Sequence, residues 1–186
     1  MTDNPKTNYA NNNKFYIFGD FDDDLLIDII VPLSNKIDQL KQQKNAEIEL
    51  HINSNGGCAD VLFKLIDLVE MAKRNDIVVK TIVTLYAFSS GSLLAITGTK
   101  GERYISKNAE HLIHHGQFGG GRRQTALQIE RMANKEKRWI EAVYNHYKEY
   151  CKIPKLREEM KDDQFYLPAD KCIEYGLADK FTSEIK

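Results

Sequence analysis

The sequence has no apolar run near the length of about 20 residues that a membrane-spanning helix needs. Its first residues are polar and rich in asparagine, so they lack the apolar centre of an export signal. The three cysteines, Cys58, Cys151 and Cys172, are odd in number and share no metal-type spacing, so we expect free thiols in a reducing cytoplasm and neither a metal nor a cofactor. With a net charge of −1, the chain has no global field for nucleic acid, which we exclude together with a membrane as a partner.

The length of 186 residues suits one domain with a sizeable core. No repeat, long linker or change of composition divides residues 14–186, which we expect to form a single domain. Residues 1–13 are expected to be a flexible polar tail.

Strand and helix patterns alternate along the chain. Apolar runs or period-two alternation predict strands at residues 14–18, 47–54, 77–86, 103–105 and 110–114. Helical spacing predicts helices at residues 26–40, 60–73, 89–96 and 124–150, with an N-terminal cap at Asp22–Asp24 and a kink or break at Pro32. This alternation predicts an α/β fold in which helices cover a parallel sheet.

Ser89 lies where a predicted strand turns into a predicted helix. Free backbone N–H groups at such a turn suit a nucleophile beside an oxyanion hole. Serine is equally a favoured helix cap, so this segment alone leaves both interpretations open.

The segment Glu110-His-Leu-Ile-His-His115 could present a general base at a strand end. A packed or surface histidine is the plainer interpretation. A metal site is disfavoured because, on a strand, His111 and His115 share a face while His114 points to the other.

Two further segments have similar ambiguity. A carboxylate in Lys161-Asp-Asp-Gln-Phe165 could orient an imidazole, or simply be solvated. The glycines of Ile52-Asn-Ser-Asn-Gly-Gly57 would let backbone N–H groups approach a ligand, or form an ordinary turn.

Together these segments resemble the Clp protease proteolytic subunit, a serine peptidase of the ClpP/crotonase superfamily. The resemblance runs from about Phe15 to about Phe181 and preserves the order and intervals of its motifs. The motifs are Ile52-Asn-Ser-Asn-Gly-Gly57, Ser89-Ser-Gly91, Leu112-Ile-His114, Asp163-Gln-Phe165 and Glu174-Tyr-Gly-Leu-Ala-Asp179.

The resemblance implies a ClpP/crotonase-like spiral of β-β-α units, in which residues 14–186 are the peptidase domain and residues 124–150 a protruding handle helix. It also implies that Ser89, His114 and Asp163 form a catalytic triad for peptide-bond hydrolysis through an acyl-enzyme. The implied oxyanion hole consists of the backbone N–H groups of Gly57 and Ser90. The implied peptide-binding strand contains Phe118, Gly119 and Gly120.

The implied partners are a peptide or unfolded protein substrate and further copies of the chain, in a heptameric ring or double ring. The handle-helix stripe from Trp139 to Tyr150 is the expected subunit interface. An AAA+ unfoldase is also implied, but Glu49 and His51 occupy the positions of its apolar docking groove and count against that partner. Such departures are typical of a divergent member, such as one encoded by a phage or mobile element.

Two alternatives to a serine peptidase remain. One is a catalytically silent structural subunit of a ring, which the complete set of triad residues disfavours. The other is a crotonase-type enzyme acting on acyl-CoA, a class that does not need a Ser-His-Asp set.

Overall fold

The computed structural model describes residues 8–116, 125–161 and 165–185. Its strands are β1 (Asn8–Asn11), β2 (Lys14–Ile17), β3 (Glu47–Ser54), β4 (Val78–Phe88), β5 (Arg103–Ile105), β6 (Glu110–Ile113), β7 (Phe165–Pro168) and β8 (Lys180–Phe181). Its α-helices are α1 (Val31–Leu40), α2 (Ala59–Arg74), α3 (Ser90–Ile96), α4 (Ala126–Tyr150), α5 (Leu156–Glu159) and α6 (Ala169–Tyr175). A π-helical segment, η1 (Leu26–Ile30), and a 3-10 turn, η2 (Thr182–Glu184), complete the described elements.

The sheet is organised around β4, which pairs in parallel with β3, β5 and β6. Residues 81–83 of β4 pair with β5, whereas residues 86–88 pair with β6. The sheet therefore branches along β4. Antiparallel pairing occurs between β1 and β2 and between β6 and β7. The predicted α/β class with a largely parallel sheet is confirmed.

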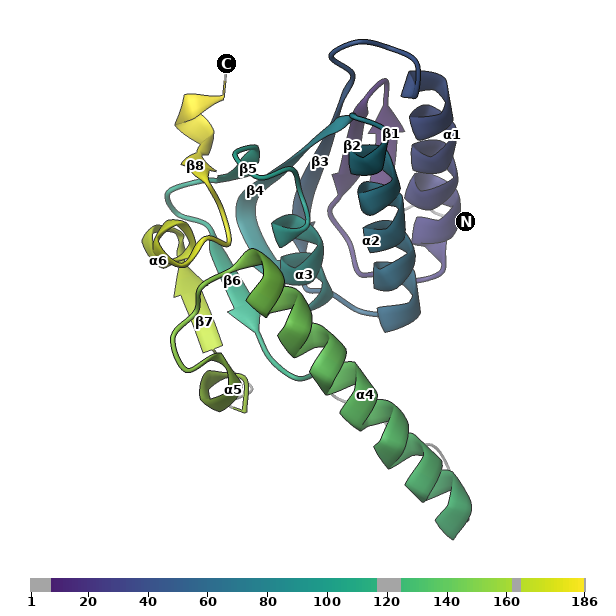
Figure 1. Cartoon of the computed structure of the whole chain (residues 1–186), viewed down its shortest axis with the longest axis vertical. Coiled ribbons are helices and arrows are strands. Elements are labelled where there is room, and N and C mark those ends of the chain that lie inside the picture. Colours follow the sequence, from purple (N-terminus) through teal and green to yellow (C-terminus); the bar gives the residue numbers. More distant parts are fainter. Residues whose placement is uncertain (1–7, 117–124, 162–164, 186) are drawn as a thin grey trace, which may run out of the picture.

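The alternation of β3 explains how the sheet and its covering helices meet. Ile48, Leu50 and Ile52 are fully buried, as predicted, and each such side chain stabilises the fold by about 1.5–3 kcal/mol relative to an exposed one. The apolar stripe of α2 is buried as well, including Leu62 and Leu65. In Figure 1, α1, α2 and α3 lie side by side over one face of the sheet.

The helix after the acidic segment begins and changes form near the predicted positions. The carboxylate of Asp22 accepts hydrogen bonds from the N–H groups of Asp24 and Leu25, at 3.1 and 3.4 Å. The π-helical η1 ends at Ile30, and α1 follows with Pro32 in its first turn. Ile30 and Val31 keep helical backbone angles, so the helix changes from π to α turns just before Pro32 without stopping.

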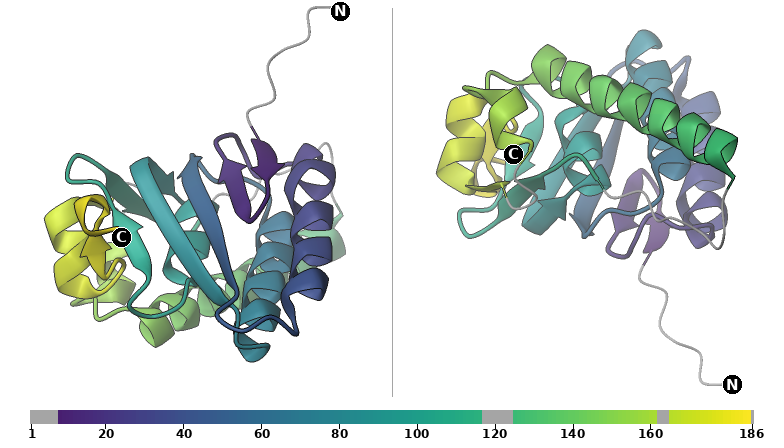
Figure 2. Two further views of the ribbon diagram at one scale, coloured as in Figure 1. Left: turned by 90° about the horizontal axis from the view of Figure 1, so that it is seen from above. Right: turned by 90° about the horizontal axis from the view of Figure 1, so that it is seen from below.

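The long helix α4 projects beyond the sheet at its N-terminal end (Figures 1 and 2). Its C-terminal half packs on α3 and contacts α2 through Trp139 and Tyr150. It begins at Ala126, after Thr125 and Gln128 form a reciprocal capping box, whereas the sequence predicted a start at residue 124. Within the described ranges, no helix is both long and apolar enough to cross a bilayer.

The apolar stripe of α4 is part of the subunit's own core. Val143 and Tyr147 are 2% and 1% exposed, and the indole Nε1 of Trp139 donates to the carbonyl of His115 at 2.9 Å. The positions of Val143 and Tyr147 are therefore closed to a subunit interface, whereas Trp139 and Tyr150 are only partly buried, so an interface on this helix stays a prediction. The period of the stripe was right, but periodicity identifies a buried face without identifying what covers it.

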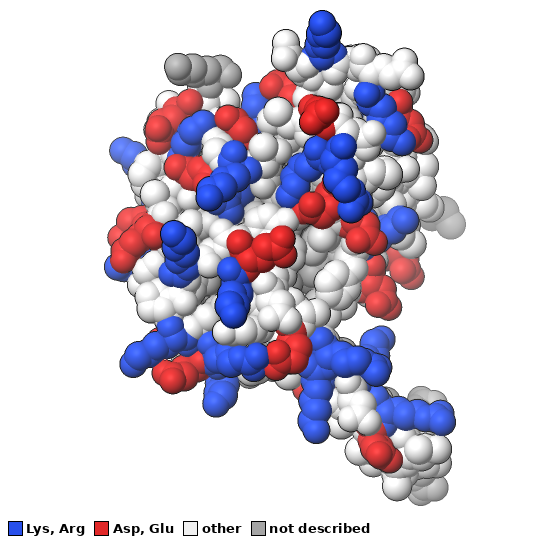
Figure 3. All heavy atoms as spheres, in the orientation of Figure 1, with Lys and Arg blue, Asp and Glu red and all other residues white. Residues whose placement is uncertain are grey.

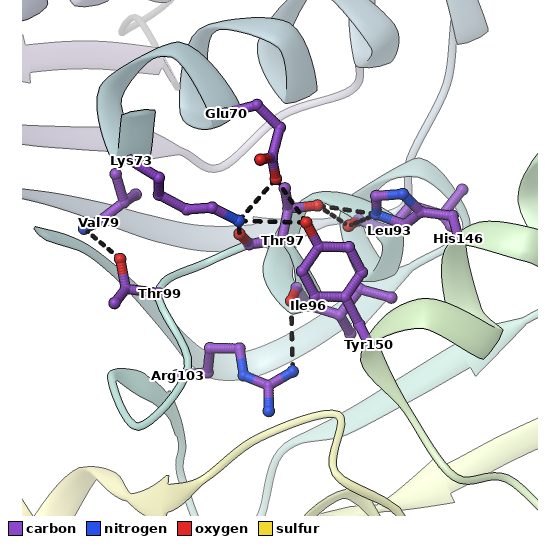
Figure 4. A network of polar contacts seen from close by, with 10 residues as sticks. All are labelled: Glu70, Lys73, Val79, Leu93, Ile96, Thr97, Thr99, Arg103, His146 and Tyr150. Carbon is purple, nitrogen blue, oxygen red and sulfur yellow. Dashed lines mark hydrogen bonds and ion pairs between the residues drawn. The ribbon is translucent and has the colours of Figure 1, made fainter. Parts of the chain in front are cut away.

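A polar network fixes the C-terminal end of α4 (Figure 4). The Lys73 ammonium donates to the Glu70 carboxylate at 2.6 Å, to the Thr97 carbonyl at 3.0 Å and to the Tyr150 hydroxyl at 3.1 Å. One turn earlier on α4, His146 contacts the Thr97 hydroxyl at 2.9 Å. Because these groups come from α2, α3 and α4, the network holds the three helices together.

The Glu-Tyr-Gly-Leu-Ala-Asp segment ends α6 and anchors the chain that follows. Gly176 ends the helix with a φ of +78°, in the left-handed region that glycine adopts most easily. Asp179 then accepts from the guanidinium of buried Arg103 at 2.6 and 2.8 Å. Burial alone would raise the pKa of Asp179, but the bonds from Arg103 lower it overall.

The N-terminal segment differs from the prediction of a flexible tail over residues 1–13, because residues 8–11 form β1. The amide oxygen of buried Asn8 accepts from the N–H groups of Phe18 and Gly19 at 3.0 and 3.1 Å. Tyr9 stacks on Tyr16 with ring centroids 4.4 Å apart. These contacts are made with residues that follow the strand, so the composition of the segment did not reveal them.

Replacement of Asn8 by alanine tests whether β1 contributes to stability. We expect Asn8→Ala to lower the free energy of unfolding by about 1–3 kcal/mol, because two backbone N–H groups lose their acceptor. Urea denaturation measures this, with Asn11→Ala at the exposed end of β1 as the matched control. Equal stability of the two variants would contradict the assignment.

Candidate active site

The backbone of Ser89 is the most unusual feature of the sheet's carboxyl edge. This residue joins β4 to α3 with φ +53° and ψ −119°, a conformation that side-chain-bearing residues rarely adopt. Its N–H donates to the Leu112 carbonyl of β6 at 2.9 Å, which holds the turn in place. Strain of this kind persists where surrounding contacts enforce it, and it often marks a functional position.

The glycine turn after β3 lies directly against Ser89. A β-carbon at Gly56 would stand 2.7 Å from the Cβ of Ser89 and 2.9 Å from the backbone nitrogen of Ser90. The φ of Gly56, +96°, independently favours glycine. Only a residue without a side chain fits between these two turns.

Contacts with Ser90 and Phe21 hold the next glycine, Gly57, beside the same turn. The hydroxyl of Ser90 donates to the Gly57 carbonyl at 3.0 Å. Phe21 brackets the turn, since its N–H donates to the Gly56 carbonyl at 2.8 Å and its carbonyl accepts from Cys58 at 2.6 Å. The first N–H groups of a helix have no partner within the helix, and Ser90 is the first residue of α3. The structure therefore brings Gly57 and Ser90, two of the predicted site residues, together.

His114 lies at the same edge of the sheet as Ser89. It directly follows β6, whose Leu112 is paired with Phe88 of β4, while Ser89 directly follows β4. The carboxyl ends of parallel strands share one edge of a sheet, and functional side chains in α/β proteins gather there. Ser89 and His114 are both half-buried.

The other predicted site residues lie outside the described residues. These are Asp163 and, in the predicted peptide-binding strand, Phe118, Gly119 and Gly120. Phe165, two positions after Asp163 in the sequence, is paired with Ile113, the neighbour of His114.

A hydrogen bond between Ser92 and His111 is present and was not predicted. The Ser92 hydroxyl and His111 Nδ1 are 2.9 Å apart, and both residues are at most 1% exposed. Burial, with a smaller effect of the Arg103 charge, lowers the pKa of His111 to about 3. This hydrogen bond joins α3 to β6. Because both residues are buried, they cannot contact a substrate. The sequence did indicate that His111 and His114 lie on opposite faces of the strand, and this difference distinguishes the buried histidine from the one at the sheet edge.

Neither a cluster of metal ligands nor the cleft near Val78 offers a competing site among the described residues. Among the described residues, no cluster of three or more His, Cys, Asp or Glu side chains could hold a metal ion. A cleft of about 620 Å³ lies near Val78, at the opposite end of β4 from Ser89. Its Glu70 and Lys73 are paired with each other, so these charges mainly secure the helices. Burial alone would raise the pKa of Glu70, but hydrogen bonds from Lys73 and Tyr150 lower it overall.

Comparison with known proteins agrees with this arrangement. The Clp protease family matches residues 15–184. The ATP-dependent Clp protease proteolytic subunit of Streptococcus uberis is 30% identical over 142 residues, covering 74% of this chain and 69% of that protein. Its counterpart from Lactococcus lactis is 29% identical over 143 residues, covering 75% and 69%. A solved structure of a mutant ClpP1 from Listeria monocytogenes superposes with a TM-score of 0.75 over 91% of both chains, at 20% identity, which supports the fold.

The buried pair predicts a pH dependence of stability. In the unfolded chain His111 titrates near 6.5, whereas in the folded chain its pKa is about 3. Between these values the unfolded chain binds more protons, so stability falls as the pH is lowered below 6.5. Lowered by burial, the pKa of His146 acts in the same direction.

We expect His111→Asn to be less stable than the wild type at pH 7.5 and to lose less stability on acidification to pH 5.5. The difference should be on the order of 1 kcal/mol over that interval. Urea denaturation at both pH values measures it, with His115→Asn as control. An unchanged slope in His111→Asn would show that this buried imidazole does not contribute.

Proposed function

The chain belongs to the Clp protease family, and from this we propose that it is a serine endopeptidase that cleaves peptide bonds through an acyl-enzyme on Ser89. The observation that carries the proposal is the strained backbone of Ser89, held between β4 and α3 against Gly56. A residue in a sharp strand-to-helix turn presents its side chain at the sheet edge, where a peptide could reach it.

In the proposed acylation, the Ser89 hydroxyl oxygen attacks the carbonyl carbon of the peptide while His114 accepts the hydroxyl proton. The N–H groups of Gly57 and Ser90 would donate to the oxyanion that forms. When the C–N bond breaks, His114 gives the proton to the leaving amine. Water then attacks the ester with His114 as base, which releases the acid and restores Ser89.

Asp163 would hold the imidazole of His114 in the correct tautomer and stabilise its charged form. Support for this role comes from the family motif and from Phe165, which pairs beside His114 two positions after Asp163. Phe118, Gly119 and Gly120 are proposed to pair with the extended substrate backbone, in the manner of an added strand.

The assembly that we propose is the ring of the family, a heptamer or double heptamer enclosing the active sites. Its substrate would be a peptide or an unfolded protein. The free thiols, of which Cys151 and Cys172 are buried, fit a reducing compartment such as the cytoplasm.

The proposal does not include the usual apolar docking of an AAA+ unfoldase. Glu49 accepts from Lys14 at 3.0 Å and from His51 at 2.9 Å. An adjacent cleft of about 720 Å³ is lined by further charged side chains, among which Lys80 pairs with Glu47 at 2.8 Å. An apolar loop would have to desolvate these groups, which is unfavourable.

Labelling with a fluorophosphonate probe tests the nucleophile. We expect one adduct per subunit by intact mass, and none in Ser89→Ala, which should also lose peptidase turnover while assembling as the wild type does. Ser106→Ala, a partly buried serine away from the turn, is the matched control and should keep the adduct. No adduct on assembled wild-type protein would favour the structural-subunit alternative.

The fit of Gly56 against Ser89 gives a second test. Gly56→Ala should lower kcat/KM for a fluorogenic peptide by about 100-fold, because the β-carbon displaces Ser89 and the N–H of Ser90. Gly101→Ala is the matched control, since Gly101 has a similar φ of +90° but, among described residues, its β-carbon would meet no atom within 4 Å. Equal losses in both variants would mean that backbone strain, not the contact, matters.

A further inference from the structure

A cleft of about 460 Å³ lies between the start of α2 and the middle of α4. Its principal lining residues are Cys58, Asp60, Phe63, Lys135, Arg138 and Trp139. None of these residues belongs to the proposed catalytic set.

The cleft adjoins the candidate active site on two sides. On the α2 side, Cys58 directly follows Gly57, whose carbonyl accepts from Ser90 at 3.0 Å. On the α4 side, Trp139 donates to the carbonyl of His115, the neighbour of His114, at 2.9 Å. The walls of the cleft therefore adjoin the glycine turn at Gly57 and the segment that follows β6 at His114 and His115.

The inner wall of the cleft is apolar and the α4 rim is basic. The rings of Phe63 and Trp139 meet edge to face with centroids 5.1 Å apart. Lys135 and Arg138 are exposed and lie three positions apart on α4, so they share one face of the helix. Figure 3 shows lysine and arginine side chains concentrated along α4 on the face in view.

The charge balance of the lining favours an anion. Two cations face one carboxylate, that of Asp60. Among the ion pairs of the described residues, none involves Lys135, Arg138 or Asp60. The two cations are thus available to a ligand without breaking an existing pair.

We infer that this cleft binds the substrate side chain next to the attacked carbonyl and selects glutamate there. The inference rests on the proposed function. A carbonyl oxygen held by the N–H of Gly57 places the side chain of the same residue beside Cys58, at the mouth of the cleft. The methylene groups of glutamate would pack on Phe63 and Trp139, and its carboxylate would lie between Lys135 and Arg138. Glutamine has the same shape without the charge, which makes it the discriminating comparison.

The experiment uses fluorogenic peptides that differ only in the residue before the cleaved bond, which is glutamate, glutamine or leucine. For the assembled wild-type protein we expect kcat/KM to be about fivefold higher for glutamate than for glutamine, as two partly screened charges would give. Raising the salt concentration should reduce this ratio, because exposed charges are screened.

Arg138→Glu should abolish or reverse the preference for glutamate over glutamine, because its carboxylate would repel that of the substrate. Lys137→Glu is the matched control, with the same charge change one residue away on another face of α4, and should keep the preference. Arg138→Gln, a milder change, should give an intermediate ratio.

Occupancy of the cleft can be measured independently through the alkylation rate of Cys58, the exposed cysteine at its mouth. In the inactive Ser89→Ala protein, a glutamate peptide should slow this alkylation, and adding Arg138→Glu should remove the effect. Equal kcat/KM for glutamate and glutamine, with normal turnover of leucine, would overturn the inference while leaving the peptidase intact. A loss of assembly together with equal losses on all peptides in Arg138→Glu and Arg138→Gln would also overturn it, because the cleft would then be covered by another copy. Absence of any turnover and of the Ser89 adduct would instead reject the proposed function.

Discussion

The close contact between Gly56 and Ser89 constrains the turns that follow β3 and β4, because a side chain at Gly56 would collide with Ser89. A β-carbon on Gly56 would stand 2.7 Å from that of Ser89, so the carboxyl ends of β3 and β4 must lie side by side. Their parallel pairing provides this, with an irregularity in register between Ile52 and Ser54 that lets the turn bend toward Ser89. Phe21 then holds the glycine turn from the other side. The unusual backbone of Ser89 is sustained by this packing rather than by its own preference.

The long helix α4 connects the candidate site to the remainder of the subunit. Its C-terminal end is fixed by contacts among Lys73, Glu70 and Tyr150, which line a cleft with Val78 at the start of β4, whereas Ser89 follows the end of that strand. Its middle contacts the carbonyl of His115 through Trp139 and contributes the basic rim of the cleft beside Cys58. One helix therefore serves as a core element at one end and as a wall of the proposed substrate site in the middle.

Prediction from sequence succeeded where a local pattern sufficed. The alternation in residues 47–54 matched β3, and the helical spacing of residues 60–73 matched α2 to within one residue at each end. It failed at β1, because Asn8 and Tyr9 are held by Phe18, Gly19 and Tyr16 rather than by an apolar pattern of their own. Periodicity also did not show that Val143 and Tyr147 of α4 are buried within the subunit, and the hydrogen bond between Ser92 and His111 was not predicted. The assignment of Asp163 stays a prediction.

What the sequence determined by itself was the α/β class, the family and the candidate residues, since side-chain periodicity and motif order are properties of neighbouring residues. Only the tertiary structure decided which histidine is enclosed and which lies at the sheet edge, as His111 and His114 differ by burial. It also decided that Gly57 meets Ser90 and that a basic cleft adjoins them. These are contacts between segments far apart in the chain, and their distances depend on how strands and helices pack, which no local pattern encodes.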